Sequence, residues 1–170
     1  MNWYAVVPLS VVLAAWVGAR ADPNAVDVAD QYLAAYQRQD LDRLEELYAE
    51  HARFLDPTST QAGLASGPVA WSGRSEILRN LRATDGTTVV LQYDILRKFE
   101  HSGVVVYVAD VTYRMVSPTQ VWTGTTPVIT IVTVEGTRVT EHRDYTDYTT
   151  GTRNAVVEER GRTGNGAADR

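Results

Sequence analysis

The sequence contains no cysteine. Disulfide bonds, a thiol nucleophile and metal sites built from thiolates are therefore excluded. The absence of cysteine leaves the cellular compartment open, because an exported protein can also lack disulfides.

Clustered positive charge is also missing. The chain has 16 Lys and Arg against 21 Asp and Glu, a formal net charge of -5, and no segment forms a basic stripe. Proteins that bind nucleic acids neutralise backbone phosphates with such clusters, so no nucleic-acid partner is expected. Hydrophobic residues make up 44% and charged residues 22% of the 170 residues, which is typical of one soluble globular domain.

The N-terminal segment differs in composition from the rest. Residues 3–19 are almost continuously apolar, and the run ends in Ala19-Arg20-Ala21, whose small first and third residues suit signal peptidase. We therefore predict that residues 1–21 are a cleaved signal peptide. The protein would then be exported, either periplasmic or secreted, with no stable membrane association. Met1 and Asn2 add no basic residue, so an uncleaved membrane anchor is the alternative.

Helical periodicity begins after Pro23. Apolar residues at three- and four-residue spacing predict a first helix that includes Tyr36. A second helix, running to about Tyr48, is predicted after Asp40, which is expected to act as its N-cap. The two helices form a helical hairpin.

The next segments contain the signals of turns. A short extended segment over residues 52–55 ends at Asp56-Pro57, because proline disfavours helical backbone in the residue before it. Residues 58–70 are rich in small and turn-forming residues and predict a loop. A third, shorter helix is predicted after Ser72-Gly73.

From residue 87 onward the apolar period is two. The alternation predicts four long antiparallel strands that begin near residues 87, 103, 120 and 138. Valines on both sides of the second strand predict burial of both its faces. The polar, glycine-containing residues 151–170 predict a flexible tail. The domain over residues 22–150 is therefore expected to be α+β, with helices on one face of a sheet.

Several short segments occur in an order found in a known superfamily: Gln31-Tyr32-Leu33-Ala34-Ala35-Tyr36, Asp40-Leu41-Asp42-Arg43-Leu44, Phe54-Leu55-Asp56-Pro57, Gly73-Arg74-Ser75-Glu76-Ile77 and His142-Arg143-Asp144-Tyr145. The chain resembles nuclear transport factor 2-like proteins, and among them the SnoaL-like and ketosteroid isomerase-like domains. The resemblance implies a cone-shaped, cystatin-like α+β barrel. In it a helical hairpin and a third helix pack on a strongly bent antiparallel sheet around an apolar cavity. It also implies frequent homodimers through the outer face of the sheet.

The resemblance suggests catalytic roles for Asp56 and Tyr32. Ketosteroid isomerases carry a general base at an Asp-Pro in this place and an oxyanion donor at a Tyr on the first helix. The position of their third group, a protonated Asp, falls near Pro127 here, so steroid isomerisation is not supported. The alternative for Asp56 is a turn residue that accepts backbone N–H groups, and for Tyr32 a core aromatic residue.

His142 and Asp144 form the second candidate catalytic pair. Residues two apart on a strand share a face, so His142, Asp144 and Tyr148 are expected to project together. A carboxylate beside a histidine fixes its tautomer and supports general acid–base chemistry. Limonene-epoxide-hydrolase-like relatives place a catalytic Asp in a similar context, where Asp110 would be a second Asp and Val108 replaces their Arg. The alternative is a polar patch without catalytic function.

The remaining motifs argue against other chemistry. His51 is expected at the end of the second helix, where it can interact with the helix C-terminus, and His101 in a turn. The three histidines lack the spacing of metal ligands. No phosphate-binding glycine loop and no Gly-x-Ser-x-Gly motif occurs in the sequence. Neither a metal nor a cofactor is expected.

Four aromatic residues are expected to contact a ligand: Tyr36, Trp71, Trp122 and Tyr148. The leading hypothesis is therefore a pocket protein whose partner is a small apolar or polyketide-like molecule. Proton transfer would then support isomerisation, dehydration or water addition. The alternative is a non-catalytic ligand-binding or dimeric interaction module.

Overall fold

The computed structural model describes residues 25–62, 67–82, 87–118 and 120–156. The helices in these residues are α1 (Ala25–Gln37), α2 (Leu41–Leu47) and α3 (Arg74–Arg82), and a short 3-10 helix covers Ser59–Ala62. The strands are β1 (Tyr48–Asp56), β2 (Val69–Ser72), β3 (Thr88–His101), β4 (Val104–Val116), β5 (Val121–Glu135), β6 (Arg138–Thr146) and β7 (Thr152–Val156). The expected signal peptide, residues 1–21, lies outside the described residues.

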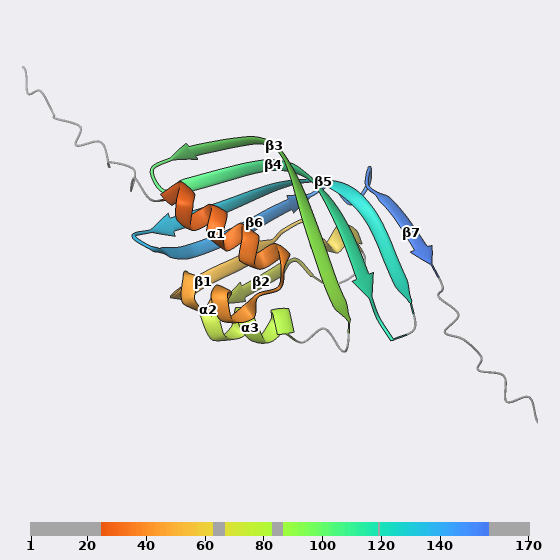
Figure 1. The fold of residues 1–170 in the computed structure, drawn as a ribbon, viewed down its shortest axis with the longest axis horizontal. Helices are drawn as coiled ribbons and strands as arrows, with labels where there is room; N and C mark the ends of the chain where they lie inside the picture. Colours follow the sequence, from red (N-terminus) through yellow and green to blue (C-terminus); the bar gives the residue numbers. More distant parts are fainter. Residues whose placement is uncertain (1–24, 63–66, 83–86, 119, 157–170) are drawn as a thin grey trace, which may run out of the picture.

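The strands form one sheet in the order β2-β1-β6-β5-β4-β3, with β7 paired to β5. The sheet bends strongly, and α1 lies across its concave face with α2 and α3 beside β1 and β2 (Figure 1). The α+β class and the bent sheet agree with the prediction. The sheet is mixed, however, because β1 runs parallel to β6 while all the other strand pairs described in the sheet are antiparallel.

The helical hairpin forms as the sequence predicts. α1 turns one apolar stripe into the core, and that stripe includes Tyr32 and Tyr36. Asp40 caps α2, and its carboxylate accepts a hydrogen bond from the backbone N–H of Arg43 at 3.1 Å. α2 is shorter than predicted, because Tyr48 already has extended backbone and begins β1.

Two strands occur where the sequence predicts none. β2 begins in the last two residues of the predicted loop, extends to Ser72 and pairs with β1, where Phe54 is opposite Trp71. β7 lies in the predicted flexible tail and pairs with the first part of β5, which β6 leaves free because its pairing begins at Val128. Gly124 permits this approach, since a Cβ atom there would stand 2.0 Å from the carbonyl oxygen of Thr152.

The β3–β4 hairpin fixes how the long strands present their faces. Ser102 and Gly103 both have positive φ, at 51° and 81°, as a two-residue turn that matches strand twist requires. On β4, Val105 and Tyr107 are fully buried whereas Val106 and Val108 are half-buried. The prediction that both faces of this strand are buried is therefore wrong for the single chain, because nothing in the described part of the chain covers the outer face.

The apolar core leaves space at one end. Its larger cluster packs α1 and α2 against β4, β5 and β6, and a smaller cluster of Ala109, Val111 and Val128 lies farther along the sheet. Leu91 and Tyr93 contact both clusters. Of the helices described, none is both long and apolar enough to cross a membrane.

Candidate functional site

A cavity of about 420 Å³ opens on the concave side of the sheet. Its walls come from α1, the 3-10 helix, the four strands β3 to β6 and the segment between β6 and β7 with the start of β7. The lining residues are Tyr36, Gln61, Val89, Leu91, Tyr93, Val111, Tyr113, Met115, Trp122, Thr126, Val128, Asp144, Thr146, Tyr148, Gly151 and Thr152. Most of this surface is aliphatic or aromatic. Asp144 contributes the single carboxylate, and no Lys, Arg or His belongs to the lining within the described residues.

The Asp144 carboxylate is held by one hydrogen bond and lies beside a histidine. Thr130, which is opposite Asp144 in the β5–β6 register, donates its hydroxyl proton to Oδ1 at 2.5 Å. The other oxygen, Oδ2, lies 2.9 Å from Nε2 of His142. Asp144 is 8% exposed, so its carboxylate is almost enclosed but still reaches the cavity. These contacts fix the orientation of the carboxylate toward the ligand space.

His142 lies behind Asp144 and does not line the cavity. It is fully buried, and its ring stacks on Phe54 with centroids 4.4 Å apart and planes 4° apart. The parallel pairing of β1 and β6 creates this contact, because it sets Phe54 opposite His142. His142 is therefore placed to position Asp144 and not to touch a ligand.

A chain of hydroxyl groups continues behind His142. Nδ1 lies 2.9 Å from the hydroxyl of Tyr32, which lies 2.5 Å from the hydroxyl of Tyr48. If His142 is neutral with its proton on Nε2, Tyr48 donates to Tyr32 and Tyr32 donates to Nδ1. Every hydroxyl proton in the chain then has an acceptor, and the Nε2 proton is directed toward Asp144. The contact to Asp144 is bent, because Nε2 has no regular hydrogen-bond partner within the described residues.

Asp56 is on the same side of the sheet as Asp144 but is fully engaged. Its Oδ1 accepts hydrogen bonds from the backbone N–H and the hydroxyl of Thr58, at 2.9 and 2.7 Å. Its Oδ2 accepts the hydroxyl proton of Tyr148 at 2.7 Å. Asp56 is absent from the cavity lining and reaches the cavity only through Tyr148. This arrangement matches the turn-residue alternative and adds a tie between β1 and the segment after β6.

The tyrosines of the site keep their protons at neutral pH. Burial raises the pKa of Tyr36 and of Tyr93 well above the usual value near 10, and the negative charge of Asp144 raises both further. Burial, followed by the hydrogen bond to Asp56, also raises the pKa of Tyr148. Each hydroxyl is therefore neutral, and the proton of Tyr148 is already donated to Asp56.

Of the four aromatic residues expected to contact a ligand, three line the cavity and one does not. Tyr36, Trp122 and Tyr148 line the cavity, although Tyr148 follows the end of β6 instead of lying on the strand. Trp71 does not line it; its ring stacks on Phe54 with centroids 4.9 Å apart. The β1–β2 pairing, which the sequence does not predict, draws Trp71 to this place.

Asp110 does not join the site. Its neighbours Ala109 and Val111 are buried on the concave side, so Asp110 projects from the outer face together with Val108. Pro127, which pairs with Asp110, is exposed. The second carboxylate and the arginine of the hydrolase-like arrangement therefore have no equivalents at these positions. No group of three potential metal ligands occurs within the described residues.

Sequence analysis missed three polar residues of the site: Tyr48, Thr130 and Tyr93. Thr130 forms a 3.4 Å contact with the Tyr93 hydroxyl, so it connects the Asp144 carboxylate to a cavity tyrosine. In the β5–β6 hairpin, Glu135 pairs with Arg138. A regular antiparallel ladder that continues from this pair would place residue 129 opposite Asp144. A β-bulge next to Thr133 shifts the register by one residue and brings Thr130 there instead.

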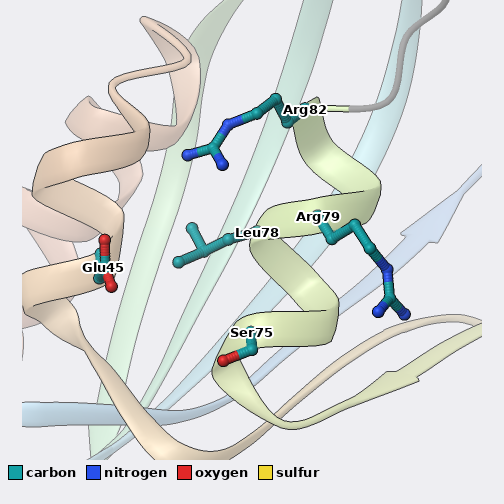
Figure 2. A pocket seen from close by; sticks show the side chains of 5 residues that line it. All are labelled: Glu45, Ser75, Leu78, Arg79 and Arg82. Carbon is teal, nitrogen blue, oxygen red and sulfur yellow. The ribbon is translucent and has the colours of Figure 1, made fainter.

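A second hollow, of about 410 Å³, lies between α2 and α3. Figure 2 shows Leu78 and Arg82 directed toward the side of Glu45, while Arg79 points away from it. Four of its five lining residues are exposed, Leu78 being the exception. In the part of the chain that the structure describes, it shares no residue with the Asp144 cavity and contains no hydrogen-bonded group of polar side chains like Asp144 and its partners.

The bent mixed sheet, the helical hairpin and the cavity define a SnoaL-like domain of the nuclear transport factor 2-like fold. The family model for the SnoaL-like domain matches residues 29–142, and the chain belongs to this family. A search of curated proteins gave no significant match.

Solved structures with the same fold come from several bacteria. A protein from Shewanella putrefaciens, provisionally named a SnoaL-like polyketide cyclase, has 23% identity and a TM-score of 0.63 over 75% of this chain and 93% of its own. An epoxide hydrolase of the LEH-like type from M. tuberculosis has 19% identity and a TM-score of 0.54 over 73% and 83%. A protein from Catenulispora acidiphila with a ketosteroid isomerase-like fold, solved with trimethylamine, has 19% identity and a TM-score of 0.54 over 70% and 84%. These likenesses concern the fold.

Proposed function

We propose that this protein binds a small, largely apolar molecule in the Asp144 cavity and holds the polar group of that molecule with the Asp144 carboxylate. The observation that carries the proposal is a single, firmly oriented carboxylate in a wall that is otherwise aliphatic and aromatic. Ligand pockets commonly combine an apolar lining with a few fixed polar groups.

Proton-transfer catalysis is the second candidate function. The observation in its favour is the support behind Asp144, where Thr130 fixes one oxygen and His142, held by Tyr32, approaches the other. A general base must be held within reach of the proton that it removes, and such contacts provide that positioning. The fold neighbours named as a polyketide cyclase and an epoxide hydrolase support small-molecule chemistry of this kind, on a polyketide-like or other apolar substrate.

A ligand screen tests the binding proposal. The screen contains uncharged, anionic and cationic compounds that are small enough for a cavity of about 420 Å³. We expect some of these compounds to raise the melting temperature of the wild-type protein. Val111→Phe, which fills the cavity, should abolish these shifts. Asp144→Asn should leave the protein folded, with at most about 1–3 kcal/mol lost, and should weaken binding. Asp94→Asn, the same change on an exposed residue outside the lining, is the matched control.

Catalysis has a separate test. Compounds that bind and carry an acidic C–H group are incubated with the protein in D2O, and deuterium incorporation is followed by NMR. Exchange that depends on Asp144 and survives Asp94→Asn supports a general base. If the compounds bind but the protein accelerates deuterium incorporation into none of them, a binding module without catalytic activity is indicated.

Export is a further proposal, supported by the apolar N-terminal run and Ala19-Arg20-Ala21. The exported protein should begin at Asp22. Intact-mass measurement decides between the alternatives, because a mature mass that retains residues 1–21 indicates a membrane anchor.

A homodimer is also proposed, through an outer patch formed by Phe99, Val106, Val108, Ile129, Ile131 and Tyr145. Cross-strand pairing places these side chains in two adjacent rows on the convex side. Phe99, Ile129 and Tyr145 are 56%, 42% and 39% exposed in the single chain. Large contiguous apolar patches of this kind commonly mark protein–protein interfaces.

A further inference from the structure

Among the described residues, no side chain that lines the cavity offers a positive charge to Asp144. No Lys, Arg or His is among the lining residues in the described part of the chain. His142 is the neighbouring basic side chain, yet the hydroxyl chain behind it is complete when its ring is neutral. A cationic ring would donate from Nδ1 to Tyr32, which would then donate to Tyr48. The Tyr48 proton would be left without an acceptor among the hydrogen bonds observed, a costly arrangement for a buried group.

Three hydroxyl protons at the cavity or beside it are directed into the protein. Tyr148 donates to Asp56 at 2.7 Å, and Thr126 donates to the backbone carbonyl of Asp147 at 2.7 Å. Thr130 donates to Asp144 itself. These donors are consumed, so the oxygens of Tyr148 and Thr126 offer lone pairs to the cavity. Asp144, Tyr148 and Thr126 therefore offer hydrogen-bond acceptors to the cavity, and these acceptors favour a positively charged group.

Aromatic rings add to this electronegative surface. Tyr36, Tyr93, Tyr113 and Trp122 all contribute to the lining, and Tyr148 is a fifth aromatic residue. These rings share the cavity with the Asp144 carboxylate. The Tyr93 hydroxyl contacts Thr130, the hydrogen-bond donor of Asp144, and the Tyr36 ring centroid lies 4.9 Å from that of His142. The face of an aromatic ring attracts cations, and groups of such rings are typical of sites for alkylated ammonium ions.

We propose that the ligand of this cavity carries a positively charged nitrogen substituted with alkyl groups, a tertiary or quaternary ammonium, which lies against the aromatic rings and pairs with Asp144. This proposal rests on the binding function proposed above and specifies its ligand class. An anionic ligand would meet the like charge of Asp144. A neutral ligand would leave an almost enclosed carboxylate without a counter-charge, which is unfavourable. The alkyl substituents match the aliphatic part of the wall.

A pair of compounds of equal shape tests the charge requirement. Choline and its uncharged carbon isostere 3,3-dimethylbutan-1-ol differ only in the charged nitrogen. Their affinities for the wild-type protein are measured by ligand-observed NMR titration. We expect choline to bind at least about tenfold more tightly, which corresponds to about 1.4 kcal/mol. Asp144→Asn should weaken choline about tenfold or more and change the isostere by less than about twofold, whereas Asp94→Asn should preserve the preference.

The contrary outcomes separate the ligand class from the binding function. If the isostere binds as tightly as choline, or if choline binding is insensitive to Asp144→Asn, the ammonium proposal is overturned. If neither compound binds while uncharged or anionic members of the screen occupy the cavity, the ammonium proposal also fails and the binding function stands. If no compound of any charge class binds, both proposals are overturned.

Discussion

Asp144 and His142 are two residues apart on β6 and share a face, yet they have different places in the site. Asp144 reaches the cavity, whereas His142 is fully buried behind it and contacts Tyr32 and Phe54. A histidine in this position orients a carboxylate through one nitrogen only if a donor holds its other nitrogen. Tyr32 supplies that donor, so a residue on α1 controls the geometry of a residue on β6.

The direction of the hydroxyl chain can be tested by removing its members one at a time. In Tyr32→Phe the ring remains, but Nδ1 of His142 loses its donor and Tyr48 loses its acceptor. In Tyr48→Phe only the terminal donor is lost. We expect Tyr32→Phe to cost about 1–3 kcal/mol of unfolding free energy and Tyr48→Phe less, by urea denaturation. A larger loss for Tyr48→Phe would contradict the direction proposed for the chain.

The buried tyrosines make stability depend on alkaline pH. Burial is the largest cause that raises the pKa of Tyr32, Tyr36, Tyr48 and Tyr93 above the value of 10.0 expected in the unfolded chain. The unfolded chain therefore loses these protons near pH 10 while the folded chain retains them. Their contribution is complete below pH 10 and is lost as the pH rises above it, by about 1.4 kcal/mol per pH unit for each group.

We expect the melting temperature to fall steeply above about pH 10 and part of the tyrosinate absorbance at 295 nm to appear together with unfolding. Far-UV circular dichroism recorded on the same samples gives the unfolding transition. Complete tyrosine ionisation near pH 10 in a protein that is still folded would contradict the raised pKa values.

At the scale of elements, β7 is the least expected part of the fold and borders the cavity. It pairs with β5 over residues 121–125, and Thr152 and the preceding Gly151 line the cavity. Gly124 and Gly151 permit the close contact, since a Cβ atom at Gly151 would lie 2.9 Å from the Thr126 side chain. A strand that closes part of a ligand site contributes to both stability and binding.

Two truncations separate β7 from the sequence that follows it. Deletion of residues 158–170, which lack periodic apolar positions, should change the unfolding free energy by less than about 1 kcal/mol. Deletion of residues 152–170 also removes the β5 pairing and should cost more, about 1–3 kcal/mol. Chemical denaturation of both variants measures the difference. Equal losses would indicate that β7 does not stabilise the domain.

At the scale of the whole molecule, the convex face of the sheet carries an apolar patch while the concave face holds the core and the cavity. The outer patch of Phe99, Val106, Val108, Ile129, Ile131 and Tyr145 crosses four strands. Because Val106 and Val108 of this patch alternate with the buried residues of β4, the sequence of β4 is apolar on both faces, as in a strand that is buried on both sides. That pattern is consistent with burial of the second face in an assembly.

The dimer proposal predicts the effect of one charge. Ile129→Lys in the centre of the outer patch should shift the protein from dimer to monomer in sedimentation-equilibrium experiments, because an unpaired charge is costly inside an apolar interface. Thr88→Lys, at an exposed position at the start of β3, is the control and should leave the assembly unchanged. A wild-type protein that is monomeric at all accessible concentrations would contradict the proposal.

Local patterns in the sequence determined most of the elements. Three- and four-residue periodicity placed α1 and α2, the Asp40 side chain fixed where α2 begins, and alternation placed the four long strands. The same alternation correctly predicted that His142 and Asp144 share a face. These features depend on residues that are close in the chain, so backbone geometry alone relates the pattern to the structure.

Only the tertiary structure decided how these parts meet. The parallel pairing of β1 with β6 places Phe54 on His142, and the bulge near Thr133 brings Thr130 to Asp144. Asp56 became a tie to Tyr148, although its sequence context suggested a base. β2 and β7 are strands because β1 and the first part of β5 each have a free edge with which they pair. Pairing between distant segments, and one-residue shifts in register, depend on the packing of the whole sheet, so no local pattern records them.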